Sequence, residues 1–366
     1  MNSKERFYAC VDYRHPDRPP CDFRAVWQII NGLMDYYGES SYEALMIRLG
    51  TDFRFIAPRY VGPELKIHED GSVEGLWGQR SKISGSGNGT FNETVYLPYA
   101  DVTDVAELDA FRFPSADWFD YSHVSEDADR FEKYIVTAGY IGASNSGDSP
   151  GYGVSPPCAP DFINGMARIR GTEQILIDIA LEDPVFIELV NRKHRLSMEI
   201  YENILTAGKG KIDVLYLADD LGNQESLMIS PLKFDRLFAE KYRELFALAH
   251  RHNAKAMMHC CGSVRRLIPR LIDLGLDILD VLQPKAAGME IEELKKYFHK
   301  KIVFAGSMCI QETLPFGSKE DVRAEIFKRR SLFSDGGLII APSNNLQTDT
   351  SIENIIAMYD AIKETI

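Results

Sequence analysis

The chain has 366 residues, of which 45% are hydrophobic and 26% charged, and its formal net charge is −13. This composition is that of a globular protein with ample material for a core, and it excludes extensive disorder. The acidic balance argues against a general nucleic-acid binder, because neutralising phosphates needs a basic face.

Membrane and secretory classes are also not expected. No apolar stretch approaches the length needed to cross a membrane, and the first residues lack the apolar core of a signal peptide. The six cysteines are too sparse for a disulfide framework, so clustered cysteines point to metal binding or catalysis. We therefore expect a cytoplasmic protein that binds neither nucleic acid nor membrane.

Short apolar strands alternate with amphipathic helices along the chain. A long helix is expected from the N-cap Ser230 to Arg251, and a last helix is opened by the capping-box-like run from Thr350 to Glu353. Other helices are expected over 264–273, 291–298 and about 319–333. The predicted strands cover residues 21–27, 53–58, 134–142, 212–218, 254–259, 277–282, 302–305 and 338–341.

About eight such strands, each buried on both faces, predict a parallel sheet closed into a (β/α)8 TIM barrel, and a doubly wound open sheet is the alternative. Residues 62–113 interrupt this pattern after the second strand. They are rich in Gly, Ser and Asn and contain alternating segments such as Thr90 to Tyr96, which indicates an antiparallel insertion. No internal repeat or linker is visible, so residues 1–366 are expected to form one barrel domain.

Polar side chains follow the predicted strand ends, where barrel enzymes keep their sites. They are Asp219, Asp220, Gln224, His259, Cys261, Gln283, Cys309 and Asn344.

His259 and Cys261 alternate at one strand end, so imidazole and thiolate point to the same side and can bind one ion, most simply zinc. The alternative is a buried cysteine beside a hydrogen-bonded core histidine. Asp219 and Asp220 have two possible interpretations. They are catalytic carboxylates, or one caps a helix and the other is a solvated residue of the loop.

Several segments resemble the uroporphyrinogen decarboxylase superfamily, and the resemblance covers nearly the whole chain. The resemblance implies a (β/α)8 barrel. It also implies one of two branches, the decarboxylases of haem biosynthesis or the zinc-dependent methyltransferases that work with methylated corrinoid proteins. The segments are Glu5-Arg-Phe to Asp17-Arg18-Pro19-Pro20, Leu76-Trp77-Gly78 with Tyr96-Leu-Pro98, Asp219-Asp-Leu-Gly-Asn-Gln224, His259-Cys-Cys-Gly-Ser263, and Ile340-Ala-Pro342 to Asp349-Thr350.

The chain departs from the decarboxylase branch at positions that carry its chemistry. That branch has paired arginines after the first strand, whereas this chain has Arg24 and then Gln28. Where the family's catalytic aspartate would lie, the chain reads Arg59-Tyr60, and the decarboxylases' tyrosine after the third strand has no clear counterpart in residues 162–167. Asn344 stands where the decarboxylases have a histidine.

The methyltransferase branch carries a His-x-Cys motif with a distant cysteine, and His259 and Cys261 match its first two positions. The third position falls at residues 342–344, where Asn344 is a poor zinc ligand. Cys309 follows a neighbouring strand, and its spacing makes it the predicted third ligand. Asp219 or Asp220 completes the predicted site, as ligand or catalytic group.

The resemblance therefore implies methyl transfer between a small donor or acceptor and a corrinoid on a separate protein, since the chain lacks an Asp-x-His-x-x-Gly signature of its own. It also implies a homodimer. The aromatic residues Trp27, Tyr60 and Tyr152 suit O-demethylation of an aromatic ether. The residues expected to orient the substrate are Arg24, Arg59, Gln224, Gln283 and Asn344.

Two other functions stay open. A metal-free lyase would act on a carboxylated substrate with Arg24, Arg59 and Asp220, and its cysteines would be inert. A non-catalytic protein would bind a tetrapyrrole or corrinoid at the barrel mouth without an ion or a base.

Overall fold

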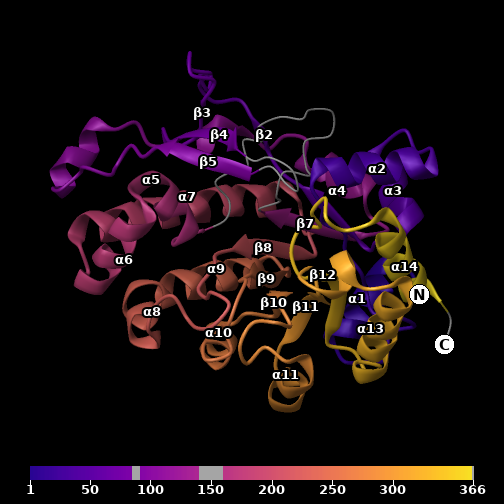
Figure 1. The fold of residues 1–366 in the computed structure, drawn as a ribbon. Helices are drawn as coiled ribbons and strands as arrows, with labels where there is room; N and C mark the ends of the chain where they lie inside the picture. Colours follow the sequence, from indigo (N-terminus) through magenta and orange to yellow (C-terminus); the bar gives the residue numbers. More distant parts are fainter. Residues whose placement is uncertain (85–90, 140–159, 365–366) are drawn as a thin grey trace.

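The structure is a computed structural model that describes residues 1–84, 91–139 and 160–364. Seven strands form one parallel sheet, which confirms the predicted alternation of strands and helices (Figure 1). In sheet order they are β1 (Phe53–Ile56), β7 (Ile135–Gly139), β8 (Val214–Ala218), β9 (Lys255–His259), β10 (Ile278–Leu282), β11 (Val303–Met308) and β12 (Leu338–Pro342).

The segment around Cys21 takes the eighth position of the barrel, between β12 and β1. The strand predicted over residues 21–27 is present only as two isolated parallel bridges, from Cys21 to Ile340 and from Ala25 to Leu346. The Cys21 carbonyl accepts a hydrogen bond from the Asp52 backbone N–H at 2.9 Å. The Cys21 N–H donates to the Asp52 carboxylate rather than to a strand, so no regular ladder forms here. The barrel fold is nevertheless confirmed.

Helices surround the sheet (Figure 1). The helix predicted from 231 to 251 is broken at Phe238, whose φ of −125° is not helical. The last helix is capped by Ser351, one residue later than predicted. The helices are α1 (Ser3–Val11), α2 (Trp27–Tyr37), α3 (Tyr42–Leu49), α4 (Val124–Arg130), α5 (Asn164–Arg170), α6 (Thr172–Leu181), α7 (Pro184–Ala207), α8 (Pro231–Leu237), α9 (Ala239–Arg251), α10 (Ile268–Leu274), α11 (Ile291–Phe298), α12 (Thr313–Phe316), α13 (Lys319–Leu332) and α14 (Ile352–Lys363).

The barrel interior has an apolar layer near the start of the strands. Helix α1 (Ser3–Val11) contributes Phe7 to this layer. Residues two apart in a strand face the same side, so the residues two positions later point into the barrel nearer its C-terminal mouth. The strand residues of the apolar layer include Phe53, Ile135, Val214, Met257, Ile278, Val303 and Ile339.

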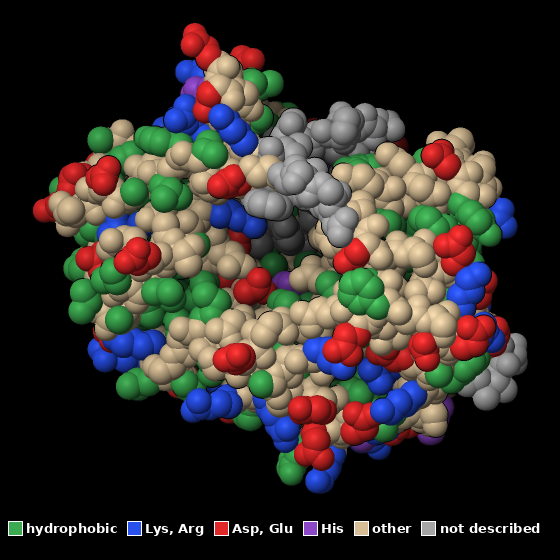
Figure 2. Space-filling model, in the orientation of Figure 1, with side chains coloured by type: hydrophobic (Ala, Val, Ile, Leu, Met, Phe, Trp, Pro, Cys, Tyr) green, Lys and Arg blue, Asp and Glu red, His purple; other side chains and the backbone are tan. Residues whose placement is uncertain are grey.

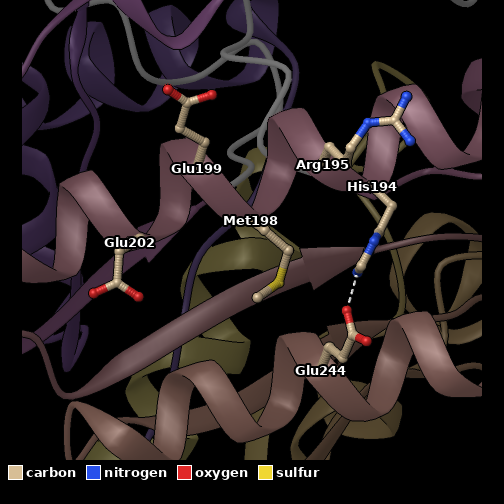
Figure 3. Close-up of a pocket in the computed structure, with 6 residues that line it drawn as sticks. All are labelled: His194, Arg195, Met198, Glu199, Glu202 and Glu244. Carbon is tan, nitrogen blue, oxygen red and sulfur yellow. Dashed lines mark ion pairs between the residues drawn. The ribbon is translucent and has the colours of Figure 1, made fainter.

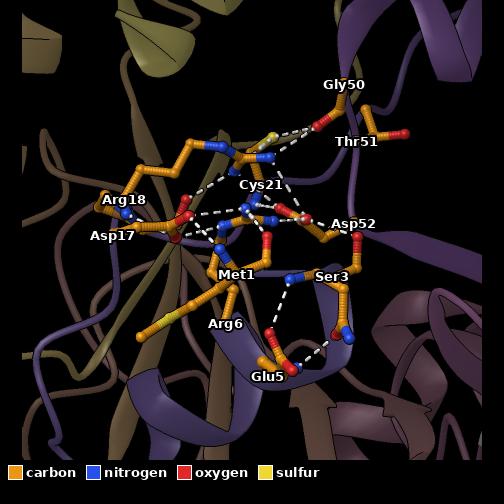
Figure 4. A network of polar contacts seen from close by, with 12 residues as sticks. Met1, Ser3, Glu5, Arg6, Asp17, Arg18, Cys21, Gly50, Thr51 and Asp52 are labelled. Atoms are coloured by element: carbon orange, nitrogen blue, oxygen red, sulfur yellow. Dashed lines mark hydrogen bonds and ion pairs between the residues drawn. The ribbon is translucent and has the colours of Figure 1, made fainter. Parts of the chain in front are cut away.

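A polar network fixes α1 and the Cys21 segment to the beginning of β1 (Figure 4). The buried carboxylate of Asp52 accepts hydrogen bonds from Arg6 at 2.7 Å, Arg18 at 2.8 Å and the Cys21 N–H at 2.8 Å. Because Arg24 follows three residues later, this network also sets where Arg24 enters the barrel.

The insertion after β1 is antiparallel, as predicted. Strand β2 (Arg59–Tyr60) pairs with β6 (Phe119–Asp120), and β3 (Val73–Glu74), β4 (Arg80–Ser84) and β5 (Phe91–Tyr96) form a separate sheet beside the barrel (Figure 1). Two 3₁₀ turns, η1 (Val105–Ala110) and η2 (Ala116–Trp118), lead into β6. Among the described residues, no helix combines the length and apolar character needed to cross a membrane.

Candidate functional site

His259 ends β9 and lies half-buried between two carboxylates at the barrel mouth. Its Nδ1 atom lies 3.2 Å from Oδ2 of Asp280, and its Nε2 atom lies 3.5 Å from Oδ1 of Asp220. Asp280 belongs to β10, and Asp220 lies in the loop after β8. Three consecutive strands of the sheet therefore supply the imidazole and the two carboxylates that contact it.

Cys261 lies two residues beyond His259 and is also half-buried. Its backbone N–H donates to Oδ1 of Asp220 at 2.8 Å, and Oδ2 of that carboxylate accepts from the Asn164 side chain at 2.8 Å. Burial, and then the nearby Asp220 carboxylate, raise the pKa of the Cys261 thiol to about 11. Asp220 is thus fixed beside both the imidazole and the thiol.

Asn344 approaches this group from the loop after β12. Its Nδ2 atom lies 4.0 Å from Sγ of Cys261, and its Oδ1 atom accepts a hydrogen bond from the Asn345 N–H. The position where the methyltransferase motif has its third cysteine therefore faces Cys261 in this chain, but it carries an amide.

Arg24 reaches the same place from the Cys21 segment, where it is held by carboxylates. Its Nη1 atom donates to Asp280 at 2.5 Å and to the hydroxyl of Tyr216 at 3.0 Å, and its Nε atom donates to Asp22 at 3.1 Å. The guanidinium group is therefore engaged by two buried acids through Nε and Nη1, while its buried Nη2 atom has no hydrogen-bond partner among the described residues. Its role in orienting a substrate stays a prediction.

Asp219 is turned away from the imidazole and is 1% exposed. Its carboxylate accepts hydrogen bonds from the backbone N–H groups of Phe162 and Ile163 and from the Tyr242 hydroxyl at 2.6 Å. Burial and then the Asp161 carboxylate raise its pKa to about 7, against the lowering effect of these hydrogen bonds. The arrangement holds the segment that leads into α5, and it does not present Asp219 at the mouth.

Three further predicted residues lie apart from this group. Arg59 is exposed on β2, opposite Asp120 of β6, because β2 leaves the barrel for the insertion. Gln224 is exposed, and the buried Gln283 side chain accepts from the Lys285 N–H in its own loop. In the described part of the chain, none of these three side chains forms a hydrogen bond or ion pair with His259 or Cys261.

Cys309 is also separate from the pair. It is 1% exposed, and β10 lies between β9 and β11 in the sheet. With neighbouring strands about 5 Å apart, the end of β11 lies roughly 10 Å from the end of β9. Over residues 1–84, 91–139 and 160–364, no three His, Cys, Asp or Glu side chains form a group that could hold a metal ion. The predicted triad of His259, Cys261 and Cys309 is therefore not brought together.

Sequence reasoning missed Asp280, Tyr216 and Asn164. Asp280 was counted as part of an apolar strand, although a single carboxylate in such a run is a signal of a buried polar site. It lies two residues after Ile278, which packs in the apolar interior layer, so the alternation of the strand could have placed it inside the barrel. Cys158 and Tyr152 lie outside the described residues.

The molecule is hollowed near the centre of the face in Figure 2, where acidic side chains and a histidine are visible. A second concave region, a pocket of about 510 Å³, lies between α7 and α9 on the outside of the barrel (Figure 3). There His194 of α7 lies 3.2 Å from Glu244 of α9, and burial lowers the pKa of His194 to about 4. This pocket is not part of the strand-end site.

Comparisons with known proteins agree with this architecture. The family model described as uroporphyrinogen decarboxylase (URO-D) matches residues 165–365. Among solved structures, a methyltransferase from Methanosarcina mazei is similar with a TM-score of 0.63 and 17% sequence identity, covering 99% of this chain and 98% of that chain. At this identity the likeness shows the fold. No curated protein matches the sequence.

Proposed function

Because the chain belongs to the uroporphyrinogen decarboxylase family, we propose that it is a methyltransferase that uses a zinc ion bound by His259 and Cys261. It would move a methyl group between a small donor or acceptor and the corrinoid of a separate protein. The observation that carries this proposal is the imidazole held between two carboxylates next to a thiol at the barrel mouth.

The residues present fit zinc in part. A metal-binding histidine usually donates its other ring N–H to a carboxylate, and Asp280 is the carboxylate in that place. Cys261 supplies the soft ligand, and Asp220 is the nearest oxygen donor. Asn344 replaces the third cysteine of the family's motif, so a bound ion would depend on Asp220 or on the substrate to complete its coordination.

The side chains of the site have separate tasks in this proposal. Asp280 holds the His259 ring, so that Nε2 is free toward the mouth. The Cys261 thiol, with its raised pKa, must lose a proton before it can act as a ligand, and a bound cation favours that loss. Asp220, which accepts from the Cys261 backbone N–H, is the carboxylate proposed to accept that proton. When bound, zinc would polarise the heteroatom that carries the methyl group.

A decarboxylase-like lyase is less well supported. A substrate with several carboxylates needs free cationic groups, and Arg24 is engaged by Asp22 and Asp280. Arg59, the other arginine assigned to that function, lies on β2 in the insertion. The fold likeness to a methyltransferase is consistent with the proposal but does not identify a substrate.

The first test is the zinc content of protein purified without chelators, compared with Cys261→Ser and with Cys309→Ser as the matched control. We expect about one zinc per chain, lost in the first variant and retained in the second. Protein that binds zinc is then mixed with cob(I)alamin and methyl donors, including an aromatic methyl ether, and methylcobalamin is followed by absorbance. Wild-type protein without zinc would refute the zinc mechanism and return attention to the lyase.

A further inference from the structure

Asp280 lies in the middle of a strand but is not a core residue in the usual sense. It is fully buried, and it points into the barrel one step above Ile278, which packs in the apolar layer. Ionised carboxylates are almost never buried unless they are paired. What surrounds this carboxylate therefore decides its role.

Three donors from three different elements meet on one oxygen of Asp280. Oδ2 accepts from Arg24 Nη1 at 2.5 Å, from the Tyr216 hydroxyl at 2.5 Å, and contacts His259 Nδ1 at 3.2 Å. Arg24 also lies over the Tyr216 ring, 5.2 Å from its centre. The Arg24 guanidinium, which is always charged, forms a buried ion pair with this carboxylate, so Asp280 is held in its ionised form.

An ionised carboxylate can only accept hydrogen bonds, which fixes the role of its neighbours. The His259 nitrogen that contacts it must carry the hydrogen, so Nδ1 is the donor. In the neutral ring, Nε2 then has a free lone pair, and it lies on the side of Asp220. Asp280 lies nearer the ring than Asp220, at 3.2 Å against 3.5 Å, so the contact with Asp280 sets the tautomer of His259.

We infer that Asp280 is a positioning residue that fixes His259 as the Nδ1–H tautomer and directs Nε2 toward the barrel mouth. Arg24 and Tyr216 hold the Asp280 carboxylate in place for this task. The inference about the His259 tautomer does not depend on the proposed function. Its consequence for zinc binding rests on that function.

Asp280→Asn tests the tautomer directly. The amide has nearly the same shape, and Arg24 and Tyr216 keep its oxygen in the place of Oδ2, facing His259, but the negative charge beside Nδ1 is gone. The Asp220 carboxylate beside Nε2 is then the stronger acceptor near the ring. The protein is labelled with ¹⁵N-histidine, kept free of zinc and studied by NMR at a pH where the ring is neutral, with His259→Gln to assign the signal. We expect Nδ1–H in the wild type and a clear gain of the Nε2–H form in the variant. An unchanged tautomer would overturn the inference.

Zinc affinity provides the second readout, measured by competition between the intact protein and a chromophoric chelator. Loss of such a carboxylate partner typically weakens metal binding by roughly 10- to 100-fold, which is expected for Asp280→Asn. The matched control is Asp213→Asn. Asp213 is also buried and accepts from Lys4, Tyr8 and the Val136 N–H, but these contacts lie at the start of β8, near α1.

The control separates positioning from general loosening of the barrel. Asp213→Asn should lower stability while keeping the tautomer and the zinc affinity. Equal weakening by both variants, or none by Asp280→Asn, would refute the positioning role. If Asp280→Asn does not fold, Tyr216→Phe takes its place, with a mixture of tautomers expected. If the wild type binds no zinc, the proposed function fails, but the NMR result still decides the inference.

Discussion

Arg24→Met should strongly destabilise the protein, because Arg24 is the cation shared by two buried acids. Its ion pairs with Asp22 at 3.1 Å and Asp280 at 2.5 Å join side chains that are at most 13% exposed. Methionine keeps the apolar stem but leaves both carboxylates without their cation. Removing one partner of a buried ion pair typically costs about 3–5 kcal/mol, and we expect a loss of unfolding free energy in that range at about pH 7.5.

The pH dependence of this loss can be worked out from the same contacts. In the wild type, Arg24 lowers the pKa of Asp280 in the folded protein below its value in the unfolded chain. The stability that Asp280 contributes is therefore fully present above the unfolded pKa, and it is lost as the pH falls through the folded pKa. Burial already keeps the pKa of Asp22 above its ordinary value in the wild type, although Arg24 lowers it. Without Arg24, the pKa of Asp22 rises further, and burial raises the pKa of Asp280 above its unfolded value as well. Asp22 and Asp280 then bind protons on folding, so the stability deficit of Arg24→Met should shrink between about pH 7.5 and pH 5.

Urea unfolding followed by circular dichroism at both pH values measures the effect. The matched control is Arg330→Met, which also removes a guanidinium from a site only 6% exposed, but whose contact is the Ala361 carbonyl at 2.8 Å. It should cost about 1–2 kcal/mol with little dependence on pH. A cost for Arg24→Met that is below about 1 kcal/mol, or independent of pH, would refute the idea that Arg24 anchors buried carboxylates.

Three further predictions concern the strand-end site. Asn344→Cys places a second thiol opposite Cys261, across a contact that is now 4.0 Å, and should tighten zinc binding at least about tenfold in chelator competition. Because the pKa of the Cys261 thiol is raised to about 11, zinc binding at neutral pH should release a proton that a pH indicator detects, and Cys261→Ser should release fewer. Asp219 has a folded pKa of about 7 against an ordinary value of 3.8, so it binds a proton more tightly in the folded protein than in the unfolded chain. The stability that this proton binding contributes is therefore lost as the pH rises from about 4 to 7. Asp219→Asn removes the titrating group, so it should flatten that part of the profile of melting temperature against pH.

The sequence predicted the barrel well because its strands are continuous apolar runs separated by helical patterns. Seven of the eight predicted strands are present at nearly the predicted residues. The first predicted strand, over residues 21–27, is not regular, because the Cys21 N–H donates to the side chain of Asp52 and forms no hydrogen bond with a neighbouring strand. A side-chain hydrogen bond of this kind depends on a residue distant in sequence, and no local pattern reports it.

Part of the candidate site could also be predicted, because the ends of parallel strands meet at one edge of the barrel. His259, Cys261, Asp220 and Asn344 were identified on that basis, and the structure places them in contact with one another, directly or through one neighbour. Cys309 was expected as a ligand because its strand neighbours the strand that carries the motif's third position. The predicted strand over residues 277–282 nevertheless separates Cys309 from His259 and Cys261, and the structure places β10 there. The pairing of Arg24 with Tyr216 and Asp280 could not be predicted, because these partners lie on β8 and β10 and no local pattern links them to Arg24.

The interior of the barrel carries a further argument for function at the mouth. Near α1 its layer is filled by apolar side chains such as Phe7 and Ile278, and one step higher it holds Arg24, Tyr216 and Asp280. Buried ion pairs rarely stabilise a fold more than apolar residues of similar volume would. Stability alone therefore does not account for a charged layer in a barrel that already packs an apolar one. Among the described residues, this layer forms a hydrogen bond with His259 at the mouth, so holding that imidazole is the task that explains the charges.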